Sequence, residues 1–431
     1  MISDLAKALK IPDIRKKLLV TFAVLALYRF LAHIPVPTAN LEALKALFDN
    51  SQFASFLNLF AGGGLRNLSI VALGIGPYIN ASIIVQLFVM LSPKVEQMLK
   101  DEGSAGRQKL NMYTQLLTLP IALVQAYGIY YLLNRETFGG MSILPTNSPL
   151  DVLLFVLIST AGTYLVVWLG ELITERGIGN GISMLVFAGI LTGIPGGLGG
   201  LISLFDLTQL FNIIIFGLVG LGVIFAVVYI NESFRKIEVQ YSGSSNGQTR
   251  KTASRTYIPV KINQSGVMPL IFAVSLVLLP SMLGSYLQNL PNPTFSEIGI
   301  WLSINFQSTG WLYGMTYFLL IFLFTYFYTN ISFNPDKIAE EIRTAGGYLP
   351  GIRPGRQTVS YLKYVINRLT LAGGLFLGGV AIVPTIIQNY TGVSSLAIGG
   401  TGLLIVVSVV LETVKQLQSN VITSEYKSFT R

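Results

Sequence analysis

Long runs of apolar residues, separated by shorter polar stretches, make up most of the 431-residue chain. Runs of this kind are typical of membrane-spanning helices, because about 20 apolar residues cover the hydrocarbon core of a bilayer. The pattern predicts ten spans, at about residues 18–34, 58–90, 110–133, 150–170, 181–200, 210–230, 266–286, 311–330, 368–388 and 398–417. We therefore expect an all-α polytopic membrane protein. Residues 1–17 predict a separate amphipathic helix at the membrane surface.

One of these runs, residues 58–90, is poorly built for a simple span. It contains three consecutive glycines, 62–64, which Arg66 follows, and Pro77 interrupts its middle. The regular stretch after Pro77, roughly 15 residues, is shorter than the ~20 that a helix needs to cross a bilayer alone. Non-helical backbone persists at membrane depth only where it is buried in protein or lines a water-filled cavity. The run therefore predicts a cavity within the membrane.

The composition supports a membrane protein and excludes several kinds of chemistry. Hydrophobic residues make up 52% of the chain and charged residues 11%, whereas soluble domains carry about 25% charged residues. The chain has no cysteine, and His33 is its only histidine, so thiolate chemistry is excluded and a histidine metal site is not expected. The sequence contains no phosphate-binding loop, zinc-protease or serine-hydrolase motif. We expect no enzymatic activity and no cofactor.

Ionisable residues are almost absent from the predicted spans. Arg29 lies near the outer end of the first span, and Glu412 lies near the inner end of the last. Ion-coupled transporters usually place carboxylates near the membrane midplane. The pattern therefore argues against coupling to a proton or sodium gradient.

The basic residues predict the orientation of the chain. If the N-terminus is cytoplasmic, nearly all of the 29 Lys and Arg side chains fall on the cytoplasmic side, and so do both termini. Two long loops, 231–263 and 332–367, are then cytoplasmic as well. The spans divide into two halves, 1–205 and 206–431, and an odd number of spans in each half predicts an inverted repeat.

Branched aliphatic side chains recur at helical spacing in several spans. A ring of such residues can form a hydrophobic constriction in a pore. The candidates are Ile75 and Ile79; Ile182, Val186 and Ile190; Val267 and Ile271; and Ile405. Ordinary helix packing produces the same spacing, so the pattern alone leaves both interpretations open.

Polar side chains also occur on the predicted spans. They are Asn80, Gln86, Gln115, Gln125, Asn263 and Gln264. Hydrogen bonds between membrane helices contribute about 0.6–2 kcal/mol each, which is weak enough to break when a ligand competes. Permanent contacts between packed helices are the alternative interpretation.

The second long loop contains an unusual turn. A helical pattern is followed by the sequence GIRPG and a second helical pattern, and Pro350 and Pro354 stiffen the turn around Arg353 and Arg356. Exposed arginines on a stiff loop suit an acidic protein or the phosphates of RNA. The alternative is that these arginines lie at the membrane surface and serve only to set the orientation of the chain.

Several long motifs resemble the bacterial SecY family of protein-conducting channels. They are GIGPYINASIIVQL (74–87), ITERGIGNGIS (173–183), LPGIRPGRQT (349–358), NRLTLAGG (367–374) and GGTGLLIVVSV (399–409). They occur in the family's order, and the resemblance extends from HIPVP (33–37) to the C-terminal tail.

The resemblance implies a fold, partners and an activity. The fold would have ten transmembrane helices in two inverted five-helix halves around an hourglass pore. The partners would be SecE and usually SecG, the SecA ATPase, the ribosome, and signal peptides and nascent chains. The protein would translocate unfolded secretory polypeptides across the bacterial cytoplasmic (inner) membrane and release transmembrane segments laterally into the lipid bilayer, driven by SecA or the ribosome.

The resemblance also implies roles for individual residues. A short plug helix maps to residues 56–69: Phe56, Leu57, Asn58, Leu59, Phe60, Ala61, Gly62, Gly63, Gly64, Leu65, Arg66, Asn67, Leu68 and Ser69. The pore ring maps to Ile75, Ile79, Val186, Ile271 and Ile405, with Ile182 and Ile190 as neighbours. A lateral gate between the second and third spans and the seventh and eighth includes Asn80, Gln86, Gln125, Asn263 and Val267.

Docking of SecA and the ribosome is implied mainly for Arg353. The wider basic set is Arg235, Lys236, Arg250, Lys251, Arg255 and Arg356. The loop at 241–256 is rich in Ser, Gly, Asn and Thr and is less basic than the family usually has there.

Two other functions remain alternatives on the sequence. A secondary transporter with inverted repeats also uses broken helices and would bind a small solute at the midplane. A scaffold or insertase that docks ribosomes without conducting polypeptides is the second.

Overall fold

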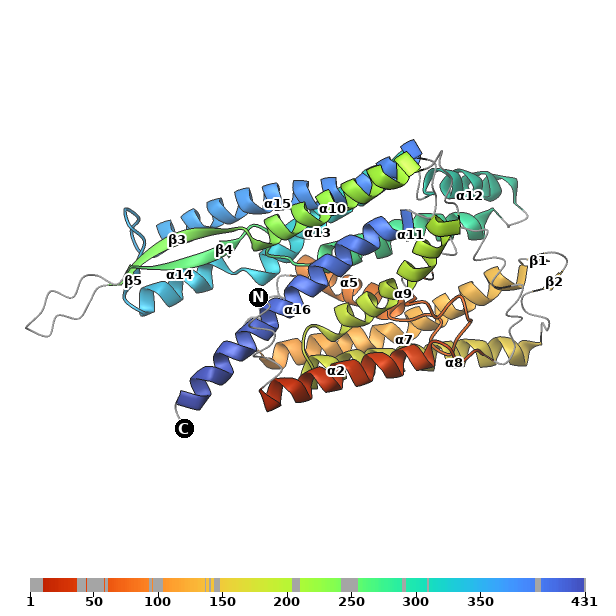
Figure 1. Ribbon diagram of the computed structural model, residues 1–431, viewed down its shortest axis with the longest axis horizontal. Helices are drawn as coiled ribbons and strands as arrows, with labels where there is room; N and C mark the ends of the chain where they lie inside the picture. The colour runs from red at the N-terminus through yellow and green to blue at the C-terminus, as the bar shows by residue number, and fades with distance from the viewer. Residues whose placement is uncertain are drawn as a thin grey trace, which may run out of the picture.

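The computed structural model describes residues 11–36, 44, 58, 61–92, 95, 104–135, 137–138, 141–142, 148–203, 210–241, 255–288, 292–307, 310–391 and 397–429. Each predicted span contains or overlaps a helix, although only the second half of the span at 58–90 is helical (Figure 1). These helices are α2 (Pro12–Leu31), α5 (Gly76–Leu91), α7 (Ser104–Arg135), α8 (Pro149–Arg176), α9 (Gly181–Ser203), α10 (Leu210–Glu232), α11 (Met268–Leu287), α13 (Trp311–Ser332), α15 (Arg356–Thr391) and α16 (Ala397–Phe429). The protein is therefore mostly helical, as predicted.

Proline residues start several of these helices. Pro12 begins α2, Pro77 lies in the first turn of α5, and Pro149 begins α8. Proline suits this position because its fixed backbone angle fits a helix and its missing N–H would have no intrahelical partner there. In α8 the Ser148 side chain also accepts a hydrogen bond from the backbone N–H of Leu150. The break before α5 that the sequence predicts is thus the start of a helix.

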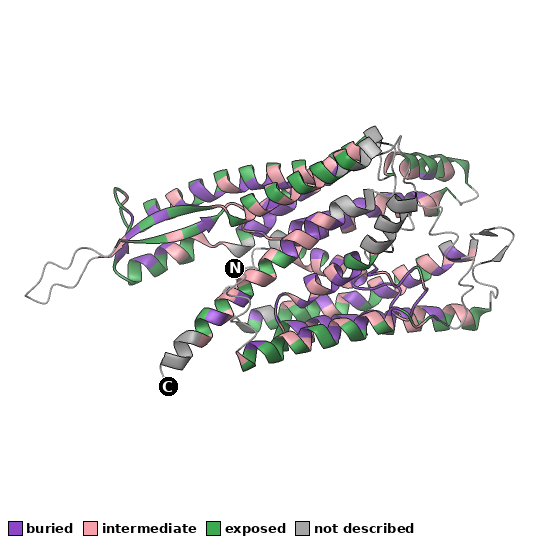
Figure 2. Ribbon diagram, viewed as in Figure 1, coloured by how far each residue is buried: buried purple, intermediate pink, exposed green. Residues whose placement is uncertain are grey.

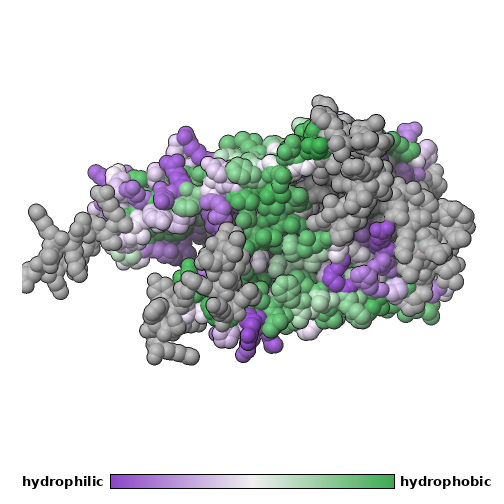
Figure 3. Space-filling view, in the orientation of Figure 1, coloured by the Kyte–Doolittle hydropathy of each residue, from purple (hydrophilic) through white to green (hydrophobic). Residues whose placement is uncertain are grey.

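Length and hydropathy support several membrane spans. Among the described residues, α8, α11, α13, α15 and α16 contain stretches long and apolar enough to cross a membrane, and α5, α9 and α10 contain shorter ones. Hydrophobic residues gather in the middle of the elongated molecule, with hydrophilic ones toward the ends (Figure 3). Leu218, Leu221 and Phe225 of α10 are among the exposed apolar side chains. The crossing of the membrane by all ten helices stays a prediction.

The helices pack around one apolar cluster. It draws buried residues from α2, α5, α8, α9, α10, α11, α13, α15 and α16 (Figure 2). Within it, α5 packs against α11, and α16 packs against α9, α10, α15 and α2; α5 also packs against α7 outside the cluster. Helices that are far apart in the sequence therefore meet at the centre of the molecule.

Several helix limits differ from the prediction. The expected surface helix at residues 1–17 is wrong for residues 12–17, because they form the start of α2. Helix α7 begins at Ser104, before the predicted start of its span at residue 110. Helix α16 continues to Phe429, beyond the predicted end of its span at residue 417. Charged residues in these extensions end the apolar run, but they do not end the helix. A short additional helix, α12 (Pro293–Asn305), follows α11.

The two long loops fold together: the helical patterns predicted on either side of GIRPG are confirmed as α14 (Pro335–Thr344) and the start of α15, but the loops also contain strands that were not predicted. Strand β3 (Phe234–Tyr241) pairs antiparallel with β4 (Arg255–Lys261) and with the two-residue β5 (Gly347–Tyr348) in the order β4-β3-β5. A second pair, β1 (Thr137–Phe138) and β2 (Met141–Ser142), is shorter. The fold is therefore not strictly all-α.

The sheet has a small apolar core of its own. Ile237 and Val239 are buried on β3, with the exposed Glu238 between them, and they pack against α14 (Pro335–Thr344) and the first turns of α15. In Figure 1 this unit extends from one end of the helix bundle. We call it the terminal unit: β3, β4, β5, α14 and the start of α15.

Candidate functional site

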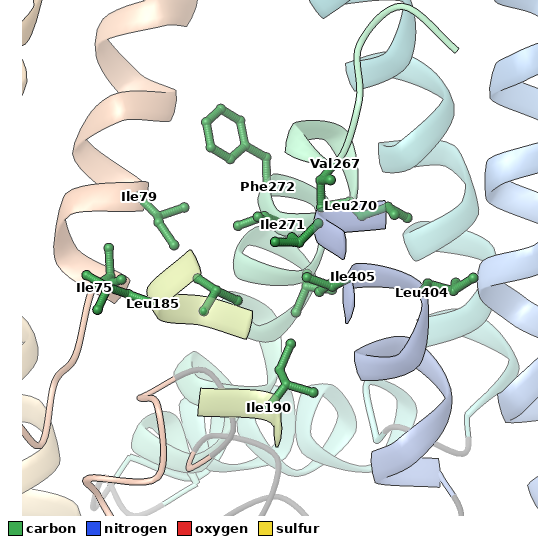
Figure 4. Packing of buried hydrophobic residues seen from close by; sticks show 14 of the residues in the cluster. Ile75, Ile79, Leu185, Ile190, Val267, Leu270, Ile271, Phe272, Leu404 and Ile405 are labelled. Carbon is green, nitrogen blue, oxygen red and sulfur yellow. The ribbon is translucent and has the colours of Figure 1, made fainter. Parts of the chain in front are cut away.

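The predicted ring residues meet at the centre of the molecule. Ile75 and Ile79 at the start of α5, Val186 and Ile190 on α9, Ile271 on α11 and Ile405 on α16 are all buried in one apolar cluster, and Ile182 packs against it. Figure 4 shows Ile79 of α5, Ile190 of α9, Ile271 of α11 and Ile405 of α16 directed toward a common centre. The structure thus brings the predicted ring together.

Neighbouring side chains on the same helices have other directions. Ile405 points toward the centre, whereas Leu404 lies on the other side of α16 (Figure 4). Leu185 of α9 and Leu270 of α11 are also buried in the cluster, although no sequence pattern selects them. Apolar residues that face the centre and residues that only pack helices together have the same spacing, so only the structure separates them.

The segment before α5 folds as a series of turns. Gly62, Gly63 and Gly74 have positive φ angles of 70°, 81° and 55°, a region that glycine enters without steric cost. Phe56, Leu57, Leu59 and Phe60 of the predicted plug lie outside the described residues. The expected plug helix does not extend over residues 61–69, because left-handed glycines there break any helical path.

This segment lies against α2, α7, α8 and α9. Its Ala61, Leu65 and Leu68 belong to a second apolar cluster with Tyr130 of α7 and Phe155 of α8. The backbone N–H of Val36 donates to the Leu68 carbonyl oxygen (2.8 Å), and the N–H of Ile70 donates to that of Ile34 (3.0 Å). Apolar packing and backbone hydrogen bonds therefore hold the segment in one position beside the ring.

Of the residues predicted for a lateral gate, Gln86, Asn80, Gln125 and Val267 lie on or at the start of the predicted gate helices α5, α7 and α11, whereas Asn263 lies in the turn before α11. Gln86 on α5 accepts a hydrogen bond from the Tyr328 hydroxyl on α13 (2.6 Å), and Val267 is buried at the start of α11. Asn80 lies on the same helix as Gln86, and its buried Oδ1 has no hydrogen-bond partner within the described part of the chain. Gln125 is half-buried on α7.

Asn263 has a different role. Its Nδ2 donates to Asn231 Oδ1 at the end of α10 (2.8 Å), and its Oδ1 accepts from Ser265 and from the backbone N–H of Gly266. The side chain therefore shapes the turn that leads into α11 and links it to α10. Among the described residues, Asn263 makes no hydrogen bond to α5 or α7.

Sequence reasoning missed one polar contact between helices. The apolar pattern places Glu171 in a connecting loop, but α8 continues to Arg176, and Glu171 Oε1 accepts a hydrogen bond from Gln115 Nε2 on α7 (2.5 Å). The Tyr164 hydroxyl of α8 donates to the Gln115 backbone carbonyl oxygen (2.6 Å). These bonds join α7 to α8.

A pocket of about 620 Å³ lies between α5 and α7. Ile84, Phe88, Leu116 and Pro120 are among its largely apolar lining residues. Its position beside Gln86, and its apolar walls, make it a candidate site for an apolar helix or a lipid chain.

The basic candidates lie on the terminal unit. Arg235 and Lys236 are exposed on β3. Arg353 is exposed in the turn before α15, and Arg356 is exposed as the first residue of that helix. Arg255 is part of β4, while Arg250, Lys251 and most of the loop at 241–256 lie outside the described residues. In the described residues no group of acidic, histidine or cysteine side chains could hold a metal ion.

Comparison with known proteins identifies the family. Residues 69–414 match the sequence model of SecY. The chain belongs to the SecY family. It is 39% identical to the protein translocase subunit SecY of Streptomyces scabiei and 38% identical to that of Aquifex aeolicus, and each alignment covers 100% of both proteins.

Solved structures with the same fold are protein-conducting channels. One reported as the structure of a protein conducting channel has a TM-score of 0.63 at 20% identity, covering 94% of this chain and 91% of that one. A SecY structure, described as one whose plug domain stabilises the closed state and maintains a membrane seal, has a TM-score of 0.66 at 23% identity with the same coverage. Sec61 in the canine ribosome-channel complex from the endoplasmic reticulum has a TM-score of 0.60 at 20% identity, also with the same coverage.

These matches define the protein broadly. It is a multi-pass membrane protein and a protein translocase subunit of the SecY family, which is not a known enzyme family, and its fold is that of protein-conducting channels. The family match favours a channel over the secondary transporter and the non-conducting scaffold considered from the sequence.

Proposed function

We propose that the chain conducts unfolded secretory polypeptides across the bacterial cytoplasmic membrane through the space between α5, α9, α11 and α16. The observation that carries this proposal is the convergence of Ile79, Ile190, Ile271 and Ile405 from four helices. Branched aliphatic side chains around a narrow path resist hydration. They can fit around an extended chain of any sequence and limit ion flow beside it.

The segment before α5 is the plug in this proposal. It lies next to the ring, and a SecY relative has a plug domain described as maintaining a membrane seal. Arg66 is exposed in this segment, and a water-filled funnel on the outer side would hydrate its charge. Displacement of the segment would open the path.

Transmembrane segments leave sideways, between α5 and α7 on one side and α11 and α13 on the other. The contact of α5 with α11 and the Tyr328–Gln86 hydrogen bond close this route in the described structure. The apolar pocket on α5 and α7 provides a surface on which a signal peptide can rest. The two units that separate are residues 1–205 and 206–431.

Energy for transport comes from partners, because the sequence contains no phosphate-binding loop. SecA or the ribosome docks on the exposed arginines of the terminal unit, with Arg353 at the tip of its turn. This unit and both termini are cytoplasmic in the orientation that the basic residues favour. SecE and SecG complete the complex.

Site-specific crosslinking tests this function. A photoreactive amino acid at Ile79 or Ile271 should capture a secretory chain stalled during transport, because both side chains face the path. The same probe at Leu157, which is exposed on α8, should capture lipid and no secretory chain. Transport that proceeds without any adduct at Ile79 and Ile271 would contradict the proposed path.

A further inference from the structure

A hydrogen bond joins α2 to the segment before α5. Nη1 of Arg29 donates to the backbone carbonyl oxygen of Gly62 (2.7 Å). Arg29 lies in the last turn of α2 and is half-buried. A half-buried cation in a membrane protein is costly unless strong acceptors surround it. The bond therefore stabilises both the guanidinium group and the position of Gly62.

The turn that contains Gly62 fits closely between two helices. We call residues 61–64 the glycine turn. A Cβ atom at Gly62 would overlap the hydroxyl group of Tyr28 on α2, and one at Gly63 would lie 3.2 Å from Thr192 Oγ1 on α9. A Cβ atom at Gly74, the residue before the ring residue Ile75, would lie 2.8 Å from the carbonyl oxygen of Ala61 in this turn. The glycine turn therefore lies directly beside the ring, with Arg29 against it.

The rest of the segment is held by other contacts. Leu65 and Leu68 pack in the apolar cluster with α7 and α8, and Leu68 accepts a backbone hydrogen bond from Val36. The Asn67 side chain donates to the carbonyl oxygen of Ala32 (3.3 Å). Residues 65–70 thus have an anchorage that does not involve Arg29. Loss of the Arg29 bond would therefore loosen the glycine turn, which Ala61 and the hydrogen bond from the Ser69 N–H to the Gly64 carbonyl oxygen also hold, without unfolding the segment.

We propose that Arg29 is a latch that holds the glycine turn over the ring in the closed channel. This inference rests on the proposed function, in which the segment before α5 is the plug. The acceptor is a backbone carbonyl group, and every translocating polypeptide carries the same group. An entering chain can therefore take the guanidinium hydrogen bond from Gly62, so that the turn leaves while Arg29 keeps a partner.

Ion conductance through the full-length chain, purified with its partner subunits and placed in planar bilayers, tests the latch. Arg29→Ala should raise the resting conductance roughly tenfold, the effect of losing one charge-assisted hydrogen bond. Arg29→Lys, which keeps a cationic donor, should restore part of the seal. Phe30→Ala is the matched control, because Phe30 is the next residue of α2 and its side chain is 66% exposed; this variant should stay sealed.

Deletion of residues 56–69 separates the latch from the plug. The deletion should leak, and adding Arg29→Ala to it should change nothing further, because the group that Arg29 holds is gone. A sealed Arg29→Ala variant beside a leaking deletion would overturn the latch and leave the plug. A further rise in the double variant would also overturn it, since Arg29 would then act elsewhere. A sealed deletion would contradict the plug and the latch together.

A second readout distinguishes release of the turn from general loss of structure. The chain has no cysteine, so Ala61→Cys introduces a single thiol at a buried position of the glycine turn. A membrane-impermeant maleimide added from outside should label this thiol faster in the Arg29→Ala variant, at an unchanged thermal unfolding temperature. Equal labelling rates with and without the Arg29→Ala substitution would contradict the proposal.

Discussion

The hydroxyl group of Tyr328 donates a 2.6 Å hydrogen bond to Oε1 of Gln86, and this bond links α13 to α5. Nε2 of Gln86 donates in turn to the Ser82 hydroxyl one turn earlier on α5 (2.8 Å), which fixes the orientation of the amide. Hydrogen bonds between membrane helices contribute about 0.6–1.7 kcal/mol. A link of this strength holds two helices together and still breaks when an entering helix competes for Gln86.

Tyr328→Phe should therefore favour the open gate. The variant keeps the aromatic ring and loses the donor, so the open population should rise about threefold to twentyfold. Export of a protein with a weakened signal peptide, measured in cells, should increase by a similar factor. Tyr326→Phe is the matched control, because its hydroxyl donates to the Asn367 carbonyl oxygen on α15 instead (3.3 Å). Equal export by both variants would show that the Gln86 bond does not restrain the gate.

The bond between Gln115 and Glu171 should matter for stability more than for gating. Glu171→Ala leaves Gln115 Nε2 without its charged acceptor between α7 and α8, a loss of about 1–3 kcal/mol. The thermal unfolding temperature of the purified protein should fall. Glu175→Ala, at an exposed position of the same helix, should leave it unchanged. A stable Glu171→Ala variant would mean that the Tyr164 hydrogen bond and apolar packing, such as that of Tyr130 against Phe155, are enough to hold α7 to α8.

The helices were predictable because a membrane imposes a simple rule on sequence. Apolar runs of the required length mark α8, α11 and α13 without knowledge of any contact. Helix ends were less predictable, because a helix continues past the apolar run when no glycine or proline stops it. Residues 12–17 of α2 are such a case.

The strands of the terminal unit are predictable from the sequence pattern, whereas the contacts of the ring residues at the centre of the molecule are not. Ile237 and Val239 alternate with polar residues along β3, which is the period of a half-buried strand. The ring, in contrast, depends on α5, α9, α11 and α16 meeting, and no local pattern indicates which aliphatic residues face the centre. The same limit applies to Glu171 and Gln115, which are 56 residues apart.

Loss of the apolar ring should make the channel leak. Ile79→Ser replaces a buried branched side chain by a small hydroxyl, so water can enter between α5 and the facing helices. Resting ion conductance in planar bilayers should rise. Ile84→Ser, on the same helix but 49% exposed, is the control and should remain sealed. An Ile79→Ser channel with unchanged resting conductance would mean that other residues form the barrier to ions.

Reversal of charge at Arg353 should impair partner-driven export without unfolding the protein. Arg353 is exposed between Gly351 and Gly355, whose φ angles of 78° and 100° shape the turn. The Thr358 hydroxyl donates to the Arg353 carbonyl oxygen (3.1 Å), so the backbone holds the turn whatever the side chain.

Arg353→Glu should therefore keep the unfolding temperature and lose most of the SecA-driven transport into vesicles, because an acidic docking surface would then be repelled. Lys337→Glu reverses an exposed cation on α14 of the same terminal unit. It serves as the control for the change in net charge, and its transport rate should stay close to that of the unaltered chain. Undiminished transport by Arg353→Glu would remove this arginine from the docking site, and equal loss in both variants would assign the effect to overall charge.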